Sequence, residues 1–474
     1  MSMKRVLILV VLGAQGLIAA QQAPPPNSPD NPPAQSGEAP RAAPAPALYG
    51  IVGIDAQAAE ETSSNLPRIP SILGGVAPTL EFRGEQERSN YIRGGINVGA
   101  TYDTNPLLTT AGSVSDNSYS VFPNVDVEQT FPRFHWVLGY AAGVTVNQRL
   151  SDRSQGSHHL DFNSDFRLTP HVNLRVAEDF SLTTGFFDSG TGADAGNGAP
   201  NASIIAPLSR QRTSSTIAEV NYHCALNDIV GASGSFYDLH FSDVPVNVIL
   251  ANTRTASGSA FWLHGFGRDW AGVSYRFQRV TFDPNGETLV HSIMAVDTLT
   301  LPGGFTISGF VGPELSQNKG LVPTGQAGGT SNFDHWSVTG GVEAGWQADR
   351  TSITGGYSRR INNGSGVLGA VLVQSGHGNV RRQLAPGWAV MAGFSYASNQ
   401  SLTVPVPGSA TSVRTATAEA SLERDIGRSL GLRLGYAHDF QNQMGTTDPN
   451  FQGGAHRNRY FATLGYQWTR ALGR

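Results

Sequence analysis

The sequence predicts an all-β protein: a transmembrane, antiparallel, up-and-down β-barrel of about eighteen strands behind a disordered, Pro-rich N-terminal segment. Three observations predict this fold class. Apolar and polar residues alternate from Tyr91 to the C-terminal end. The connections between these segments are alternately long and short, and the chain opens with a secretory signal.

The alternation has a period of two, which is typical of a strand with one apolar and one polar face. In the first segment, 91–103, the apolar face carries Ile92, Gly94, Ile96, Val98, Ala100 and Tyr102. The same pattern recurs up to the last segment, 457–469. Segments 289–300 and 377–385 alternate poorly, so a count of sixteen strands stays open.

The connections give an independent indication. Short breaks, such as Pro132–Arg133 and Gly267–Arg268, are separated by longer links. The longer links are 104–116, 187–212, 242–253, 316–333, 363–376, 399–411 and 442–456, with shorter ones near 150–157 and 283–288. Outer-membrane barrels alternate short periplasmic turns with longer external loops, so we expect an even strand number and both termini in the periplasm.

The chain divides into four parts. Residues 1–20 have a basic start, an apolar run and small residues, and predict a cleaved signal peptide. Residues 21–47 are rich in Pro and Ala and predict a disordered linker. Residues 48–86 lack periodicity, and we interpret them as a periplasmic lead-in or a plug of the barrel. Residues 91–469 form the predicted barrel.

Composition excludes several other classes. No apolar run reaches the length of roughly 18 residues that a spanning helix needs, and the single Cys224 cannot form an internal disulfide. A net charge of -4 does not suggest a nucleic-acid binder. A soluble β-sandwich also has alternating strands, but it gives no reason for aromatic residues to gather at strand ends, as Tyr102, Trp262 and Trp468 do. We therefore expect a bacterial outer-membrane location and contact with outer-membrane lipid.

The end of the first segment carries a short motif, Gly99, Tyr102, Asp103 and Asn105, within "GGINVGATYDTNPL". It resembles the opening of the poorly characterised outer-membrane β-barrel porin family of bacteria. The resemblance implies a barrel of poorly defined cargo that is sometimes linked to polysaccharide export, and it supplies no catalytic residues. The final segment also resembles the C-terminal strand that such barrels present to the barrel-assembly machinery, although "TRALGR" follows its last aromatic residue.

A barrel of this size leaves an aqueous lumen, so passive diffusion of small polar solutes or saccharides is the expected activity. Charged residues on the polar faces are candidates to line it and to bias which solutes pass. They are Arg93, Asp126, Glu128, Asp165, Arg167, Arg175, Asp179, Glu219, Arg276, Glu343, Glu419 and Arg433. Each of them can equally form a cross-strand ion pair that stabilises the wall.

The longest link, 187–212, is the third external loop, which in general porins folds into the lumen. By that analogy Asp188, Asp194, Arg210 and Arg212 are candidates for a constriction, with an ordinary surface loop as the alternative.

Catalysis and metal binding are weaker hypotheses. His158 and His159 with Asp161, or His240 with Asp238 and Asp243, offer the residue types of an outer-membrane hydrolase, but they match no known motif. Asp103, Asn105 and Asp116 carry oxygen ligands for calcium without the spacing of a calcium loop. We therefore expect no enzyme, no catalytic residue, no metal and no cofactor.

The remaining alternative is a structural or polysaccharide-export-linked barrel. In that case residues 21–86 tether the barrel to a periplasmic partner, because a plain porin starts its first strand soon after the signal peptide.

Overall fold

A computed structural model describes residues 90–110, 112–151, 154–183, 210–242, 251–283, 286–319, 333–364, 368–402, 412–427, 429–444 and 453–472. The expected signal peptide, linker and lead-in, and residues 188 and 194 of the expected constriction, lie outside these ranges. Within the described ranges, no helix has the length and the apolar character needed to cross a membrane.

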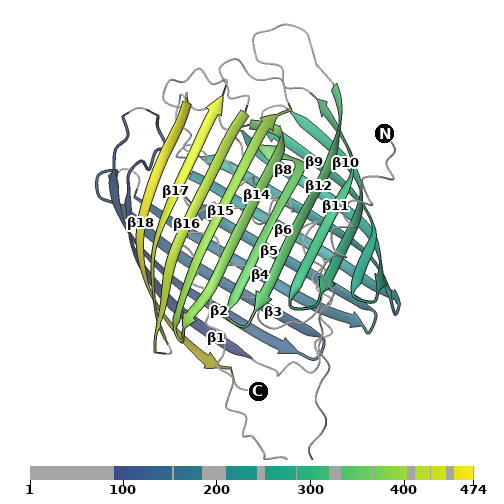
Figure 1. Ribbon diagram of the computed structural model, residues 1–474, viewed down its shortest axis with the longest axis horizontal. Coiled ribbons are helices and arrows are strands. Elements are labelled where there is room, and N and C mark those ends of the chain that lie inside the picture. Colours follow the sequence, from purple (N-terminus) through teal and green to yellow (C-terminus); the bar gives the residue numbers. More distant parts are fainter. Residues whose placement is uncertain are drawn as a thin grey trace, which may run out of the picture. The chain divides into compact units, whose positions relative to one another are not determined.

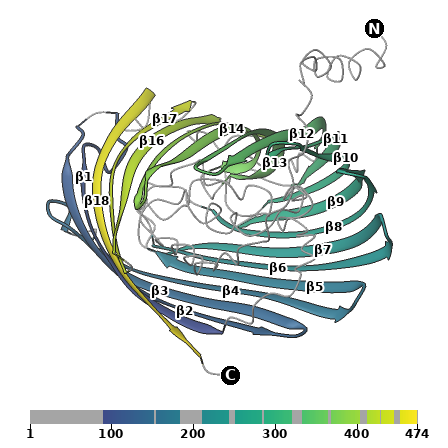
Figure 2. The ribbon, with the colours of Figure 1, turned by 60° about the horizontal axis from the view of Figure 1, so that its bottom comes forward.

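The described residues form one antiparallel sheet of eighteen strands that closes on itself (Figures 1 and 2). The strands are β1 (Tyr91–Asp103), β2 (Asp116–Phe131), β3 (Phe134–Asn147), β4 (Gln155–Thr169), β5 (Val172–Thr183), β6 (Arg210–Ala225), β7 (Asp228–Ser242), β8 (Asn252–Phe266), β9 (Asp269–Asp283), β10 (Glu287–Leu301), β11 (Phe305–Lys319), β12 (Phe333–Ala348), β13 (Thr351–Gly364), β14 (Leu368–Ala385), β15 (Trp388–Ser401), β16 (Ser412–Ile426), β17 (Leu430–Met444) and β18 (Gly453–Ala471). Each strand pairs with its neighbour in sequence, and β1 also pairs with β18. The predicted fold class and a count of eighteen are confirmed, and the alternative of sixteen strands is wrong.

Eight turns, from that between β2 and β3 to that between β16 and β17, lie at one end of the barrel, together with the start of β1 and the end of β18, and we call it the short-turn end. Each of these turns spans two or three residues, and Gly267 and Gly427 adopt φ of 74° there, a conformation that favours glycine. Asn90 fixes this end, because its side chain accepts from the Thr130 amide at 2.8 Å and its carbonyl accepts from the Leu472 amide at 2.9 Å.

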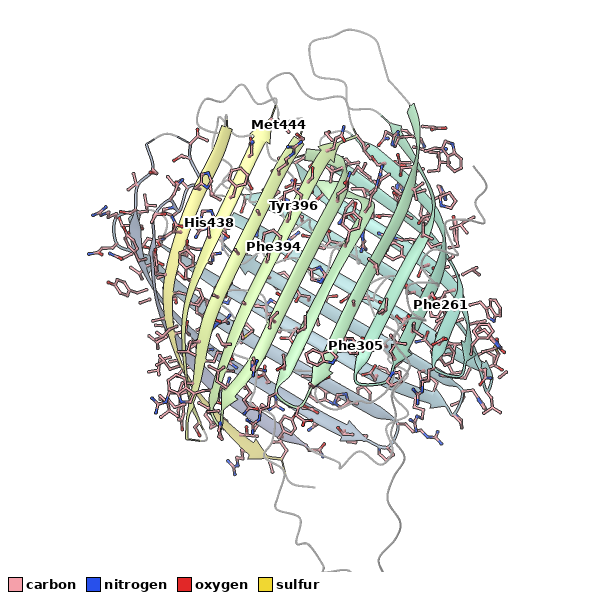
Figure 3. The ribbon with its side chains drawn as sticks, viewed as in Figure 1. Phe261, Phe305, Phe394, Tyr396, His438 and Met444 are labelled. Carbon is pink, nitrogen blue, oxygen red and sulfur yellow. The ribbon has the colours of Figure 1, made fainter. Side chains whose placement is uncertain are left out.

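Much of the outer face of the wall is apolar. In β1 the even positions from Ile96 to Tyr102 are exposed, while the odd positions Asn97 and Asp103 are buried. Exposed aromatic side chains such as Phe394 and Tyr396 on β15 and Phe305 on β11 stand on the outer positions of their strands (Figure 3). Large apolar side chains are expected on the outside of a closed barrel only where the surroundings are apolar as well.

The largest error in a predicted boundary concerns β14. We expect a long link at 363–376 and a strand at 377–385, whereas β14 starts at Leu368 and includes residues 368–376. The segment has apolar side chains on both faces, with Val371 and Val373 on one and Ala370 and Leu372 on the other. A strand that is apolar on both faces shows no alternation, so periodicity does not detect it.

Candidate functional site: the inner wall of the barrel

Asp103 and Arg457 join the first and last strands on the inner face at the loop-side end. Arg457 donates to Asp103 Oδ2 through Nε at 2.7 Å and through a terminal nitrogen at 2.5 Å. Its other terminal nitrogen lies 3.8 Å from Asp439 on β17, which also pairs with Arg459 at 2.8 Å. Two carboxylates and two guanidinium groups therefore form a network across β1, β18 and β17.

The turn that follows Asp103 is held by Asn105. Its amide donates to Asp103 Oδ1 at 3.0 Å, and its side-chain nitrogen donates to the carbonyls of Thr109 at 2.9 Å and His456 at 3.0 Å. The Tyr-Asp-x-Asn motif thus ties the first loop to β18, so its residues have a structural role in closing the barrel.

A second charged group lies on β14, β16 and β17. Arg433 donates to Glu419 at 2.9 Å and lies 3.9 Å from Glu423, which in turn pairs with Arg381 at 3.4 Å. Glu419 and Arg433 are buried, whereas the Arg381 side chain is 46% exposed. The Arg381 guanidinium is therefore accessible, whereas the buried Glu419–Arg433 pair is held in place.

A third charged group lies near the short-turn end of β1 to β4. Glu128 accepts hydrogen bonds from Tyr91 and from His135, the latter at 3.1 Å, and lies 3.9 Å from Arg93. His135 Nδ1 is also 3.9 Å from Asp165. Several donors converge on one carboxylate here, which fixes the side chains of this part of the wall.

The strand register places all twelve lumen candidates on inner-face positions. Seven of them form a side-chain ion pair or hydrogen bond with another residue of the inner wall: Arg93, Glu128, Asp165, Arg175, Asp179, Glu419 and Arg433. Glu219 and Arg276 are bonded within their own strands, to Asn221 and Gln278. The Glu343 side chain on β12 is exposed, as are those of Asp165, Arg167 and Asp179.

Sequence reasoning missed His135, Arg381, Arg457 and Arg459. All four occupy inner-face positions of their strands, so the parity of each position within its strand was the available signal. Their partners were not available from sequence, because cross-strand contacts depend on the register.

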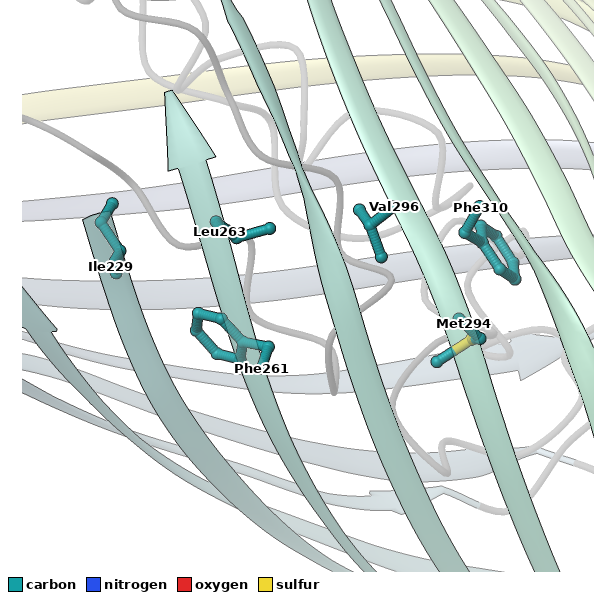
Figure 4. Packing of buried hydrophobic residues seen from close by; sticks show 6 residues of the cluster. All are labelled: Ile229, Phe261, Leu263, Met294, Val296 and Phe310. Atoms are coloured by element: carbon teal, nitrogen blue, oxygen red, sulfur yellow. The ribbon is translucent and has the colours of Figure 1, made fainter. Parts of the chain in front are cut away.

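The inner wall is not polar all round, which corrects the expected polar lumen. From β7 to β11 it carries a cluster of Ile229, Phe261, Leu263, Met294, Val296 and Phe310 (Figure 4). Further toward the loop-side end, Tyr237, Leu239 and Phe241 of β7 form a second cluster. The lumen therefore has one charged side and one apolar side.

The end of the β13–β14 hairpin leaves the wall and lies against the inner faces of β9 to β11. The amide of Ile361 on β13 donates to Glu314 Oε1 on β11 at 3.2 Å, although β12 stands between these strands in the sheet. Ile361 and Leu372 pack with Val290 of β10. We refer to residues 360–364 and 368–373 as the inward hairpin end.

Two further contacts fix the inward hairpin end. The Arg360 guanidinium lies 5.6 Å from the centre of the Phe310 ring on β11, and Ala370 packs with Val280 and Phe282 of β9. Strands β9 and β11 can contact β13 and β14 only across the lumen side of the wall. The constriction that the structure describes is therefore this hairpin.

The residues expected in the third loop are distributed differently. Arg210 and Arg212 belong to β6 and not to a loop, because the strand starts at residue 210. Arg212 occupies an outer position and pairs with Asp238 at 3.1 Å, and Arg254 pairs with the same carboxylate at 3.0 Å. The described part of this expected constriction therefore lies outside the lumen.

His159 shares the inner face of β4 with Asp161, whereas His158 lies on the opposite face, and Asp243 lies outside the described residues. His158 faces outward and contacts the Tyr140 hydroxyl at 2.9 Å, while His159 faces inward, 3.4 Å from Asp179. Asp238, expected beside His240, is held by two arginines instead.

The calcium candidates are engaged with protein donors. Asp103 holds Arg457, and Asp116 accepts from the backbone amides of Asn117 at 2.8 Å and Arg149 at 2.8 Å. Over the part of the chain that the structure describes, no group of His, Cys, Asp and Glu side chains is placed to hold a metal ion.

No protein-family model matches the chain. No curated protein matches it either. Solved structures that resemble it include the ferric citrate transporter FecA, at 9% identity over 81% of this chain and 79% of that chain, with a TM-score of 0.43. Others are OpdK of Pseudomonas aeruginosa, at 10% identity over 80% and 99% with a TM-score of 0.39, and OccK2 (OpdF) of the same organism, crystallised with glucuronate, at 10% over 81% and 100% with a TM-score of 0.41.

Proposed function

We propose that this chain is an outer-membrane channel through which small polar solutes, including saccharides, diffuse passively, and that it is not an enzyme. One observation carries the proposal: a closed eighteen-strand wall is apolar over much of its outside and carries charged side chains along much of its inner face. Closed antiparallel barrels with this distribution suit a membrane on the outside and water on the inside.

The connections support an orientation. Outer-membrane barrels keep their short turns in the periplasm, and here eight turns of two or three residues share an end with Tyr91 and Ala471. Both barrel ends would then be periplasmic, and the first loop, held by Asn105, would face the exterior.

The arrangement of the inner wall favours the passage of small solutes over large ones. The inward hairpin end occupies lumen space beside β9 to β11 and is fixed there by Glu314. Solutes pass along the remaining wall, where Glu343 and Arg381 present charge. A channel lined in this way favours polar solutes that can exchange hydrogen bonds with the wall.

The test is single-channel conductance of the full chain in planar bilayers, with ion selectivity and a panel of sugars of increasing size. We expect discrete conductance steps and a decrease in ion current when small sugars enter. A silent barrel that is tight to ions would overturn the proposal.

A tethered structural or export-linked barrel is the second candidate. Asn90, which is fixed at the short-turn end, favours it, because the residues before it start from the side that we assign to the periplasm. Deletion of residues 21–86 separates the alternatives. Loss of a co-purifying periplasmic partner with unchanged conductance supports a tether, and increased conductance supports a plug.

A further inference from the structure

The inner faces of β7 to β11 carry a row of apolar side chains toward the short-turn end. The ladders place Ile229 beside Leu263 and Val296 beside Phe310, with Gly272 of β9 between the two pairs. All four side chains belong to the cluster of Figure 4. We call Ile229, Leu263, Val296 and Phe310 the apolar row.

These side chains are covered, although they stand on the inner face of a single sheet. Leu263 is 0% exposed, whereas its neighbour Trp262 on the outer face is 46% exposed. Met294 of the same cluster is 2% exposed, and its outward neighbour Ile293 is 60% exposed. A fully buried side chain touches roughly 6 to 12 other residues, which one face of a sheet does not supply. A second layer is therefore needed over the inner face.

The described residues supply part of this layer. Trp270 is the partly buried hydrophobic side chain that packs against the cluster, and the Arg360 guanidinium lies over the Phe310 ring. The inward hairpin end packs farther toward the loops, with Val290 and Val280. Within the described ranges, no hydrophobic side chain of the hairpin belongs to the cluster around the apolar row.

Buried polar groups on the same inner face also need a partner. They are the hydroxyls of Tyr237, Thr255 and Ser274 and the side-chain nitrogen of Gln278, and none of them has a hydrogen-bond partner among the described residues. Buried polar groups are normally hydrogen-bonded. The missing layer must therefore be apolar over the row and must offer acceptors to donors such as the Gln278 amide.

A segment of matching composition precedes β1. Residues 66–80, which lie outside the described ranges, read LPRIPSILGGVAPTL and carry six large aliphatic side chains and a single charge, Arg68. Three of these residues are prolines, which have a carbonyl acceptor but no N–H donor. The segment is thus apolar and has more backbone acceptors than donors. We call it the apolar arm.

The arm is attached at the end of the barrel where the apolar row lies. Asn90 is fixed at the short-turn end, and Leu73 precedes it by 17 residues, an extended length of about 55 Å. A ring of eighteen strands, about 4.8 Å apart and tilted by about 40°, is about 36 Å across. The arm can therefore reach β8 from β1, whereas the long external loops start from the opposite end.

We propose that the apolar arm binds the apolar row inside the barrel and forms the second layer over it. Burial of the aliphatic side chains on both sides removes apolar surface from water, and carbonyls of the arm accept from the unpaired donors of the wall. The bound arm covers the apolar side of the lumen and leaves the charged side to polar solutes. The inference concerns the lumen wall and does not rest on solute passage.

The test is cross-linking within the refolded full chain. Cys224→Ser removes the single cysteine, Leu73→Cys places a thiol in the arm, and Leu263→Cys places one in the apolar row. Val137→Cys is the matched control on the inner face of β3, because both wall positions are three residues from the short-turn end of their strands. Strand β3 is also closer to Asn90 along the wall, so chain length alone favours the control.

We expect a short bismaleimide to join Leu73→Cys to Leu263→Cys several-fold more efficiently than to Val137→Cys. Equal yields, or a preference for Val137→Cys, would overturn the proposal. A cross-link between two chains, visible as a dimer on a gel, would assign the layer to a second copy and overturn it as well. Val296→Cys replaces Leu263→Cys if the latter does not refold.

A second measurement uses no cross-link. Leu73→Asp places a charge in the arm and should raise the labelling of Leu263→Cys by a water-soluble maleimide several-fold, because the arm then leaves the row. Gln57→Asp, which lies before the arm, is the control and should leave the labelling unchanged. Equal labelling in the two variants would show that something other than the arm covers the row.

Conductance of the same preparations separates this inference from the channel proposal. A silent barrel that still cross-links selectively at Leu263→Cys overturns the channel and leaves the arm in place. A conducting barrel without that selectivity overturns the arm and leaves the channel.

Discussion

Arg457 of β18 holds Asp103 of β1 at 2.5 Å, across the ladder that closes the barrel. Both side chains are almost fully buried, and Arg457 also contacts Asp439. The pair therefore links the two ends of the sheet where no covalent connection does.

Asp103→Ala is expected to destabilise the barrel by about 3 kcal/mol, because removal of one partner leaves a buried guanidinium without its main acceptor. The measurement is the urea midpoint of unfolding in detergent, followed by the gel shift between folded and unfolded forms. Arg279→Gln is the control, since its pair with Glu287 is half exposed and should contribute less than about 1 kcal/mol. Equal losses in the two variants would contradict this account.

Glu343→Gln is expected to lower the cation selectivity of the channel. Its carboxylate lies on the inner face and is exposed, so it acts on passing ions. The reversal potential in a salt gradient measures the change. Glu287→Gln, on an outer position of β10, should leave the reversal potential as it is, and a shift there would argue against the assignment of faces.

Val311→Arg is expected to cost about 2–4 kcal/mol if the outer belt contacts lipid near mid-membrane. Val311 is 56% exposed on the outside of β11. Ser308→Arg, on the inner face of the same strand, should cost much less because its guanidinium can reach water. Refolding into liposomes under urea gives both values, and a tolerated Val311→Arg would speak against membrane contact at this position.

Gly435→Val is expected to destabilise the barrel by about 1–3 kcal/mol. A Cβ at Gly435 would lie 2.2 Å from the Phe461 ring, which covers this glycine from the neighbouring strand. Phe461→Leu in the same chain should recover part of the loss in thermal unfolding. No recovery would show that the backbone, and not the ring, requires glycine.

The sequence predicts the strands of this barrel well because most outer positions carry apolar residues and eight of the turns are short. Segment 289–300 alternates poorly, yet it forms most of β10. Periodicity failed at residues 368–376 for a physical reason: Val371 and Leu372 face opposite sides, and both are buried.

The candidate site was predicted less completely. Parity places Arg93 and Glu343 on inner faces, but only the register shows that Arg93 lies near Glu128. Hydrophobic periodicity did not predict the apolar inner wall around Leu263, because β8 is apolar on both faces, with Phe261 inward and Trp262 outward. The inward hairpin end depends on contacts between β11 and β13, which are not neighbours in the sheet.

The connectivity of the sheet has a consequence for folding kinetics. Every ladder except that between β1 and β18 joins strands that are consecutive in sequence, so most pairs require the closure of only a short loop. The β1–β18 ladder alone brings together the two ends of the barrel segment, and its formation must await synthesis of the last strand. Until then β1 and β17 are open edges that can pair with other chains. Barrel closure is therefore the step at which aggregation competes most directly with folding.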